Sequence, residues 1–412
     1  MKEQRTHARS LVNGYFLLEG LNSFGTTIYF YYLYFFTERI YGFSKVQNFC
    51  VAAGLGLVYC AGSVVGGRFA QRRGYLLALK CGCAIMAVLI ASGAFVTALP
   101  AHFIIIFVGV VGMALTWPAL EALVSEGAPP EDLPRNIGIY NLVWAGAGAC
   151  AYFIGGSMIK AWTFRSMFLV PAVIFVLEII IIALLERAKS RMPAEAFQFA
   201  KAAPLPDEEE ERLHALIHPA TFLRMAWLAN PLAYLAINTI LAAVPSIANK
   251  LALSLGAAGI VCSLWQFVRA GSFVLLWKWK AWHYRFGWLV VAYVAMTAGF
   301  VTFLVAPNLP LLIAAQVLFG LGTGLVYYSS LYYSMHVGEA KGEHGGFHEA
   351  MIGVGSFAGP AISAIFLHLL PQRQGVGAIA VASVLLSGLL VLVRWRYAKR
   401  SRLENKMPIT PV

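Results

Sequence analysis

Long apolar runs alternate with short polar connections along almost the whole chain. A helix needs roughly 20 mainly apolar residues to cross the hydrocarbon of a bilayer. The chain offers twelve such runs, at about residues 12–37, 46–70, 76–98, 102–124, 135–160, 166–186, 222–250, 257–280, 286–306, 309–337, 345–370 and 374–397. We therefore predict an all-α, polytopic membrane protein with 12 transmembrane helices.

One polar segment, residues 187–221, is much longer than the other connections and divides the predicted spans into two sets of six. The predicted organisation is an N-terminal tail at 1–11, a six-helix bundle at 12–186, a linker at 187–221, a second six-helix bundle at 222–397 and a C-terminal tail at 398–412. The acidic run at 207–211 in the linker has no predicted chemical role, because such runs usually form a solvated surface.

Composition and charge agree with a membrane protein and set its orientation. Apolar residues make up 59% of the chain and charged residues only 12%, about half the charged share of an ordinary soluble domain. With a cytoplasmic N-terminus, 24 of the 31 Lys and Arg residues fall on the cytoplasmic side. This asymmetry predicts that both termini are cytoplasmic. The basic residues form no continuous face, so we expect no nucleic-acid partner.

The two predicted halves resemble each other at a constant offset. Gly112 and Gly320 are 208 residues apart, and the small-residue pattern at 147–156 recurs at 355–364 with the same offset. Small residues at every fourth position let helix backbones approach closely in lipid. The shared offset in separate spans favours an internal repeat.

A short motif between the second and third spans carries a family resemblance. The segment 67–74 reads Gly-Arg-Phe-Ala-Gln-Arg-Arg-Gly and resembles the Gly-x-x-x-Asp-Arg-x-Gly loop of the major facilitator superfamily. Gly67, Arg72 and Gly74 match, whereas Gln71 stands where the family has Asp. The resemblance extends over about residues 10–398. It implies two six-helix bundles that carry a solute by alternating access, and it implies that this loop helps to close the inner gate.

The first span carries a carboxylate within a polar stripe. Tyr15, Glu19, Asn22, Thr26 and Tyr29 recur every three or four positions, so they share one helix face. Ionisable groups inside a bilayer usually face a water-filled pathway or a partner. We predict that Glu19 carries a coupling proton; a structural hydrogen bond to a neighbouring helix is the alternative. Glu121, near the cytoplasmic end of the fourth span, is a second candidate for proton coupling or for the inner gate.

Arg269 lies near the middle of the eighth predicted span. A guanidinium cannot lose its charge in a protein, so at this depth it needs an anionic partner or an anionic substrate. Pairing with Glu19 and binding of a substrate are both open. Gln266 and Trp265, one turn away, would share its surroundings.

The remaining polar and aromatic residues of the spans complete the predicted sites. The predicted substrate-binding residues are Arg269, Gln266, Trp265, Asn22, Tyr15, Asn238, Gln316, Tyr327 and Trp144. Tyr31, Tyr32 and Tyr34, near the outer end of the first span, are expected in an interfacial aromatic belt. The predicted gate residues are Gly67, Gln71, Arg72, Gly74, His348 and Glu349.

Metal and cofactor chemistry is not expected from the sequence. His344 and His348 are one helical turn apart, but Ile352 replaces the second histidine of an HExxH motif. Gate hydrogen bonding is therefore the preferred interpretation of His348, and no cofactor is predicted. The cysteines show no CxxC pattern.

Together these observations predict a proton-coupled secondary transporter, not an enzyme. We expect a small organic solute with an anionic group, a monomeric protein and a bacterial cytoplasmic membrane. A multidrug proton antiporter, an uncoupled facilitator and a lipid flippase on the same scaffold are the alternatives.

Overall fold

The computed structural model describes residues 2–125, 133–191, 219–337, 341–373 and 375–404, and within this part of the chain every regular element is an α-helix. The helices of the N-terminal half are α1 (Lys2–Tyr41), α2 (Lys45–Arg73), α3 (Tyr75–Gly93), α4 (Leu99–Ser125), α5 (Leu133–Trp162) and α6 (Ser166–Ser190). Those of the C-terminal half are α8 (Pro219–Lys250), α9 (Leu255–Cys262), α10 (Leu264–Lys278), α11 (Phe286–Val305), α12 (Leu309–Val337), α13 (Lys341–Leu369) and α14 (Val376–Glu404).

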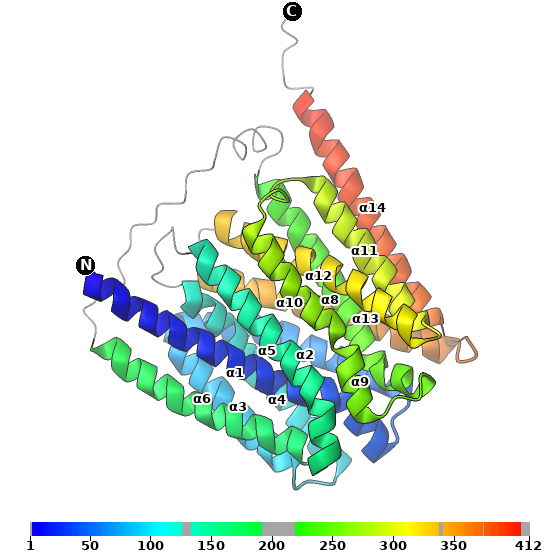
Figure 1. Ribbon diagram of the computed structural model, residues 1–412, viewed down its shortest axis with the longest axis horizontal. Helices are drawn as coiled ribbons and strands as arrows, with labels where there is room; N and C mark the ends of the chain where they lie inside the picture. The colour runs from blue at the N-terminus through cyan, green and yellow to red at the C-terminus, as the bar shows by residue number, and fades with distance from the viewer. Residues whose placement is uncertain (1, 126–132, 192–218, 338–340, 374, 405–412) are drawn as a thin grey trace, which may run out of the picture.

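The two halves lie side by side, and their helices run along a common direction (Figure 1). Within the N-terminal half α1 packs on α5 and α3 packs on α4; the equivalent pairs in the C-terminal half are α8 with α13 and α11 with α12. The halves meet along two seams, α2 against α13 and α5 against α9 and α10. Equivalent helices therefore pack in the same way in both halves, in agreement with the internal repeat of the sequence.

Glycines make these close contacts possible. A Cβ added to Gly112 would lie 2.9 Å from the carbonyl oxygen of Gly82, and one added to Gly320 would lie 2.5 Å from that of Trp265. On the seam between the halves, a Cβ on Gly353 would lie 2.5 Å from the Cα of Cys60. Only hydrogen fits at these positions, so the small-residue pattern encodes helix packing.

Eleven helical segments of the described residues are long and apolar enough to cross a membrane, with α9 and α10 together forming one of them. The first helix, α1, is 40 residues long. Its mean hydropathy is lower than that of the eleven segments because it contains several tyrosines and polar residues. Many exposed side chains of the other spans are large and apolar, which suits contact with lipid; on α6 they include Val173, Leu177 and Ile180.

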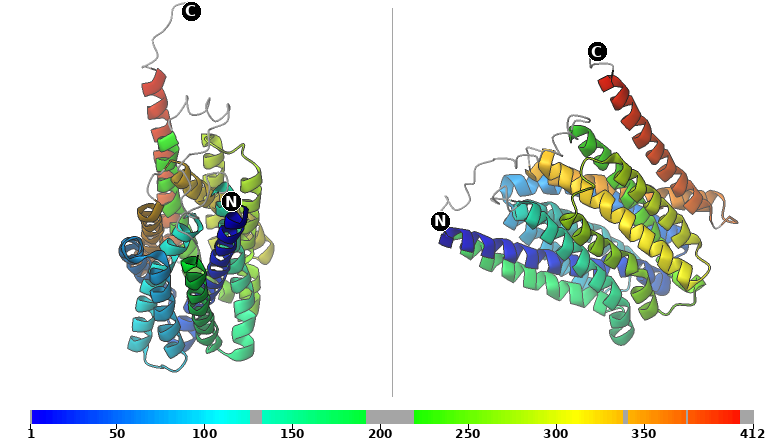
Figure 2. Two further views of the ribbon diagram at one scale, coloured as in Figure 1. Left: turned by 90° about the vertical axis from the view of Figure 1, so that its left-hand side faces the viewer. Right: turned by 45° about the horizontal axis from the view of Figure 1, so that its top comes forward.

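The ends of the chain extend the outer helices. The regular helix α1 begins at Lys2, and α14 ends at Glu404, so helix covers nearly all of the predicted N-terminal tail and the first part of the predicted C-terminal tail. The first turn of α1 and the last turn of α14 point toward the same end of the bundle (Figure 1). The last turns of α14 project beyond the other helices (Figure 2). Most of the predicted linker, 192–218, and the end of the predicted C-terminal tail, 405–412, lie outside the described residues.

The prediction of an interfacial belt at the outer end of α1 is wrong. Tyr32 and Tyr34 are buried, and the Tyr32 hydroxyl donates a hydrogen bond to the carbonyl oxygen of Tyr152 on α5. Tyr31 and Tyr34 face a cavity between the halves. These rings lie inside because α1 is covered by helices of both halves, which composition alone does not reveal.

Candidate functional site

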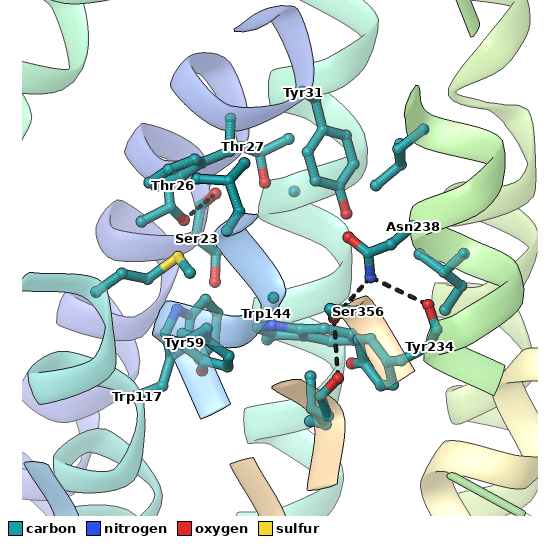
Figure 3. A pocket seen from close by; sticks show the side chains of 18 of the residues that line it. Ser23, Thr26, Thr27, Tyr31, Tyr59, Trp117, Trp144, Tyr234, Asn238 and Ser356 are labelled. Atoms are coloured by element: carbon teal, nitrogen blue, oxygen red, sulfur yellow. Dashed lines mark hydrogen bonds between the residues drawn. The ribbon is translucent and has the colours of Figure 1, made fainter. Parts of the chain in front are cut away.

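A cavity of about 170 Å³ lies between the two halves. Its wall comes from α1, α2, α4 and α5 on one side and from α8, α10, α12 and α13 on the other. Figure 3 shows Thr26, Thr27 and Tyr31 on one wall, with Asn238 and Ser356 facing them across the cavity. The lining combines aromatic rings with hydroxyl and amide groups, which suits a small organic solute.

Arg269 lies in the wall and is held by aromatic rings. Its guanidinium carbon is 4.6 Å from the ring centre of Trp144, 4.8 Å from that of Tyr327 and 5.6 Å from that of Tyr234. The rings of Trp144 and Tyr327 are themselves stacked, with centres 5.0 Å apart. Because α5 and α12 belong to opposite halves, this arrangement also joins the halves. The negative faces of the rings stabilise the cation.

The guanidinium has few polar partners. Its Nη2 donates to the Tyr234 hydroxyl at 3.4 Å, and its buried Nε has no hydrogen-bond partner in the described part of the chain. In that part, no carboxylate oxygen lies within 4.0 Å of it. Of the two predicted alternatives, pairing with Glu19 is thus not formed here. One turn away, the buried amide nitrogen of Gln266 also lacks a partner there, so two donors are available beside the cavity.

Asn238 forms part of the polar wall that the C-terminal half contributes to the cavity. Its Nδ2 donates to the Ser356 hydroxyl at 2.8 Å and to the Tyr234 carbonyl oxygen at 3.1 Å (Figure 3). The Ser356 hydroxyl in turn donates to the carbonyl oxygen of Ile352 at 2.9 Å. These hydrogen bonds occupy both hydrogens of the Asn238 amide nitrogen, so that nitrogen has none left to donate to a solute.

Glu19 lies on α1 of the N-terminal half and is completely buried. Its Oε1 accepts a hydrogen bond from Ser23 at 3.1 Å, and its Oε2 has no partner within the described residues. Glu19 itself does not line the cavity, whereas Ser23, one turn along the helix, does. The carboxylate is thus connected to the cavity through the serine hydroxyl.

Four predicted substrate contacts do not line the cavity: Asn22, Tyr15, Trp265 and Gln316. The Asn22 amide donates to Glu178 Oε2 at 3.0 Å and accepts from Thr116 at 3.3 Å, within the N-terminal half. The backbone N–H of Trp265 donates to Gln316 Oε1 at 3.3 Å, within the C-terminal half. These groups face the interior of their own bundle because the cavity-facing stripe of each helix is narrow.

A second polar cluster links the halves beside the cavity. Glu121 on α4 and His348 and Glu349 on α13 each place one donor atom within 4.8 Å of the others. The Tyr59 hydroxyl on α2 donates to Glu349 Oε2. Two buried carboxylates this close repel each other when both are ionised, so a shared proton or a cation between them would stabilise the pair.

Comparison with known protein families identifies the family to which this chain belongs. The sequence profile described as Major Facilitator Superfamily matches residues 15–229 and again residues 226–410. The chain belongs to the major facilitator superfamily. It is therefore a multi-pass membrane transporter, and the resemblance predicted from the sequence is confirmed.

Solved structures agree on the fold. A bacterial homologue of the human lysosomal transporter Spinster has a TM-score of 0.65 at 13% identity, and the alignment covers 98% of this chain and 99% of that one. The proton:xylose symporter XylE has a TM-score of 0.67 at 12% identity, covering 98% and 97%. The human organic anion transporter MFSD10 has a TM-score of 0.64 at 13% identity, covering 94% and 99%. The comparison with curated proteins gives no match.

The motif of the superfamily lies at the end of α2. Gly74 has φ 103°, a backbone conformation that side chains other than hydrogen disfavour, and it joins α2 directly to α3. Gly67 faces the other half, where a Cβ on Gly346 of α13 would lie 3.3 Å from its Cα. Gln71 and Arg72 are exposed at the helix end. Their action as gate residues stays a prediction.

Some cavity residues were not predicted from the sequence. Tyr59 and Tyr234 line the cavity, as does Ser356. Each lies in a predicted span, but a lone hydroxyl among apolar residues gives little signal. The stripe on α1 was also displaced by about one position: its cavity face is formed by Ser23, Thr26, Thr27, Phe30, Tyr31 and Tyr34.

Proposed function

We propose that this superfamily member carries a small organic anion across the membrane by alternating access, coupled to protons. The observation that carries the proposal is the buried guanidinium of Arg269 beside the cavity, with no carboxylate of the described residues within 4.0 Å. A charge inside the bilayer costs several kcal/mol. Cation–π contacts stabilise the guanidinium by about 0.5–2 kcal/mol, which is less than this cost. An anionic solute beside Arg269 would supply the rest of the stabilisation.

The size and polarity of the cavity favour a small solute. Its volume of about 170 Å³ is below the roughly 300–1,000 Å³ typical of sites for drug-sized ligands. The unpartnered donors of Arg269 and Gln266 suit a carboxylate or a similar planar anion. The rings of Trp144 and Tyr234 then contact the apolar body of the solute.

For coupling, we assign the proton to the carboxylates that adjoin the cavity. Glu121 and Glu349 come from opposite halves, so a movement of α4 relative to α13 changes their separation and their tendency to hold a shared proton. Glu19, connected to the cavity through Ser23, is a further carrier. Movement between the halves and proton exchange are in this way linked.

The distribution of basic residues supports the proposed orientation. With both termini and the linker cytoplasmic, 24 of the 31 basic residues lie on that side, as the positive-inside rule requires. We place the protein in a bacterial cytoplasmic membrane as a monomer, since the cavity is formed by one chain.

The proposal is tested with purified protein in two stages. A thermal-shift screen of small carboxylates, sulfonates and neutral analogues identifies a stabilising solute, because a ligand that binds only the folded state raises the unfolding midpoint. Flux of that solute into proteoliposomes is then measured with and without an imposed pH gradient. We expect accumulation only with the gradient, and loss of accumulation in Glu121→Gln.

Substitution of the arginine decides the anion assignment. Arg269→Ala is expected to weaken binding of the anion at least tenfold, while Asn249→Ala, at an exposed contact with Glu38 outside the cavity, leaves affinity unchanged. Unaltered affinity in Arg269→Ala contradicts the anion site. Solute equilibration without dependence on the gradient favours the uncoupled facilitator, and preferential stabilisation by lipophilic cations favours the multidrug antiporter.

A further inference from the structure

The cluster beside the cavity contains the donor atoms of a metal site. Glu121 belongs to the N-terminal half, and His348 and Glu349 to the C-terminal half, with one donor atom of each within 4.8 Å of the others. All three side chains are buried. We propose that Glu121, His348 and Glu349 bind a divalent first-row transition-metal ion between the two halves.

The histidine supplies an observation independent of the two acids. His348 is 3% exposed, and its Nε2 has no hydrogen-bond partner within the described residues. A buried imidazole nitrogen is normally satisfied by protein or water. Coordination by the neutral ring satisfies it directly, since imidazole is the commonest nitrogen ligand of metals in proteins.

Glu349 is already held in place by a supporting hydrogen bond. The Tyr59 hydroxyl donates to its Oε2, and Glu349 is also hydrogen-bonded to Glu121, so an ion bound between the two carboxylates would replace that second hydrogen bond. Hydrogen bonds of this kind orient the carboxylate and are a regular feature of metal sites. Tyr59 lies on α2 of the N-terminal half, so the carboxylate of α13 is fixed by the opposite half.

The spacing and charge fit an ion of this class. Ligand atoms of a tetrahedral zinc ion lie roughly 3.3–3.6 Å apart, given bond lengths of about 2.0–2.2 Å. Donor atoms within 4.8 Å of one another reach that spacing when side-chain rotations bring them closer by about 1.5 Å at most. A charge of +2 balances the two carboxylates, at a depth where unbalanced charge is costly.

The donor set selects the kind of metal. One imidazole nitrogen and two carboxylates suit Zn²⁺, Co²⁺, Mn²⁺ or Fe²⁺, whereas Ca²⁺ and Mg²⁺ prefer oxygen ligands alone. The sequence pointed away from a metal because Ile352 replaces the second histidine of an HExxH motif. The third ligand comes from α4, in the other half.

Protons compete for the same site. The ligands bind metal only when deprotonated, so affinity for the ion is expected to fall as the pH is lowered. The titratable groups that surround the cluster belong to six other helices: Glu19 of α1, Tyr59 of α2, Tyr140 of α5, Tyr234 of α8, Arg269 of α10 and Tyr327 of α12.

The experiment measures binding of Zn²⁺ and Co²⁺ to the purified full-length protein in detergent. Calorimetry with Zn²⁺ is expected to give one ion per chain, bound at least tenfold more weakly by His348→Asn and by Glu121→Gln. Glu178→Gln is the matched control. It changes another buried carboxylate, whose partners are Asn22 and Cys83, and should bind as the unchanged protein does. Mg²⁺ should not compete.

Absorption of the Co²⁺ complex identifies the ligands. Visible bands without thiolate charge transfer support the proposal, while thiolate bands place the ion on cysteines and overturn it. Equal Zn²⁺ affinity in all variants also overturns it. Zn²⁺ should raise the unfolding midpoint of the unchanged protein and of Glu178→Gln only; His348→Gln replaces His348→Asn if that variant does not fold. No transported solute is required, so failure here leaves the proposed function standing.

Discussion

Gly56→Ala tests whether the contact between α2 and α13 controls both stability and transport. A Cβ at this position would lie 2.7 Å from the Cα of Phe357, and closer still to that residue's backbone nitrogen. Carbon atoms in ordinary contact are about 3.5–4.0 Å apart. The two helices must therefore separate by roughly 1 Å, because the obstructing atoms belong to the backbone and have no alternative rotamer.

The expected loss of stability is obtained by comparing Gly56 with a glycine whose surroundings leave room for a methyl group. Gly146 on α5 has nothing within 4 Å of an added Cβ. Replacing glycine by alanine in a helix gains about 0.5–1 kcal/mol at either position, and this gain cancels between the two variants. Overpacking costs about 1–3 kcal/mol, so Gly56→Ala should be less stable than Gly146→Ala by that amount.

Thermal unfolding of both purified variants measures the difference, which should amount to a few degrees. Flux into proteoliposomes should fall in Gly56→Ala and stay near that of the unchanged protein in Gly146→Ala, since α2 and α13 belong to different halves. Equal unfolding midpoints for the two variants refute the reasoning, because they show that the seam accommodates a methyl group without cost.

Three further outcomes are expected. Asn22→Ala should lower stability by about 1–3 kcal/mol, by removing one of the two hydrogen-bond partners of buried Glu178, yet leave solute affinity unchanged in a binding titration. Gly74→Ala should cost about 1–3 kcal/mol in thermal unfolding, because φ is 103° there. Tyr234→Phe, which removes the hydroxyl that accepts from Arg269, should weaken anion affinity a few-fold while the fold and unfolding midpoint are kept.

Much of the fold was predictable from the sequence, because lipid imposes long apolar helices and the apolar runs are visible. Polar residues within those runs also pointed to the cavity: Arg269, Gln266, Asn238, Trp144 and Tyr327 all line it. Burying polar or charged side chains in lipid costs free energy, so the presence of such a residue in a predicted span already indicates a position inside the protein.

The remaining features depend on how helices are rotated and paired. A difference of one position on α1 separates Ser23, which lines the cavity, from Asn22, which faces Glu178. The meeting of Glu121 with Glu349 is a contact between halves far apart in the chain, and no periodicity within either helix encodes it. Periodicity defines a face of a helix but not the neighbour that it meets.

The glycine contacts between α2 and α13 have a counterpart between α5 and α9. There a Cβ on Gly156 would lie 3.1 Å from the carbonyl carbon of Leu255, and one on Gly259 would lie 3.0 Å from the carbonyl oxygen of Tyr152. At these glycines backbone approaches backbone, although the Tyr32 hydroxyl also lies against Gly259 and Tyr59 of α2 donates to Glu349 of α13. These two glycine-lined contacts join the halves at α2 with α13 and at α5 with α9. During the proposed alternating access we expect the halves to move along these two contacts, because a glycine has no side-chain rotamer to change.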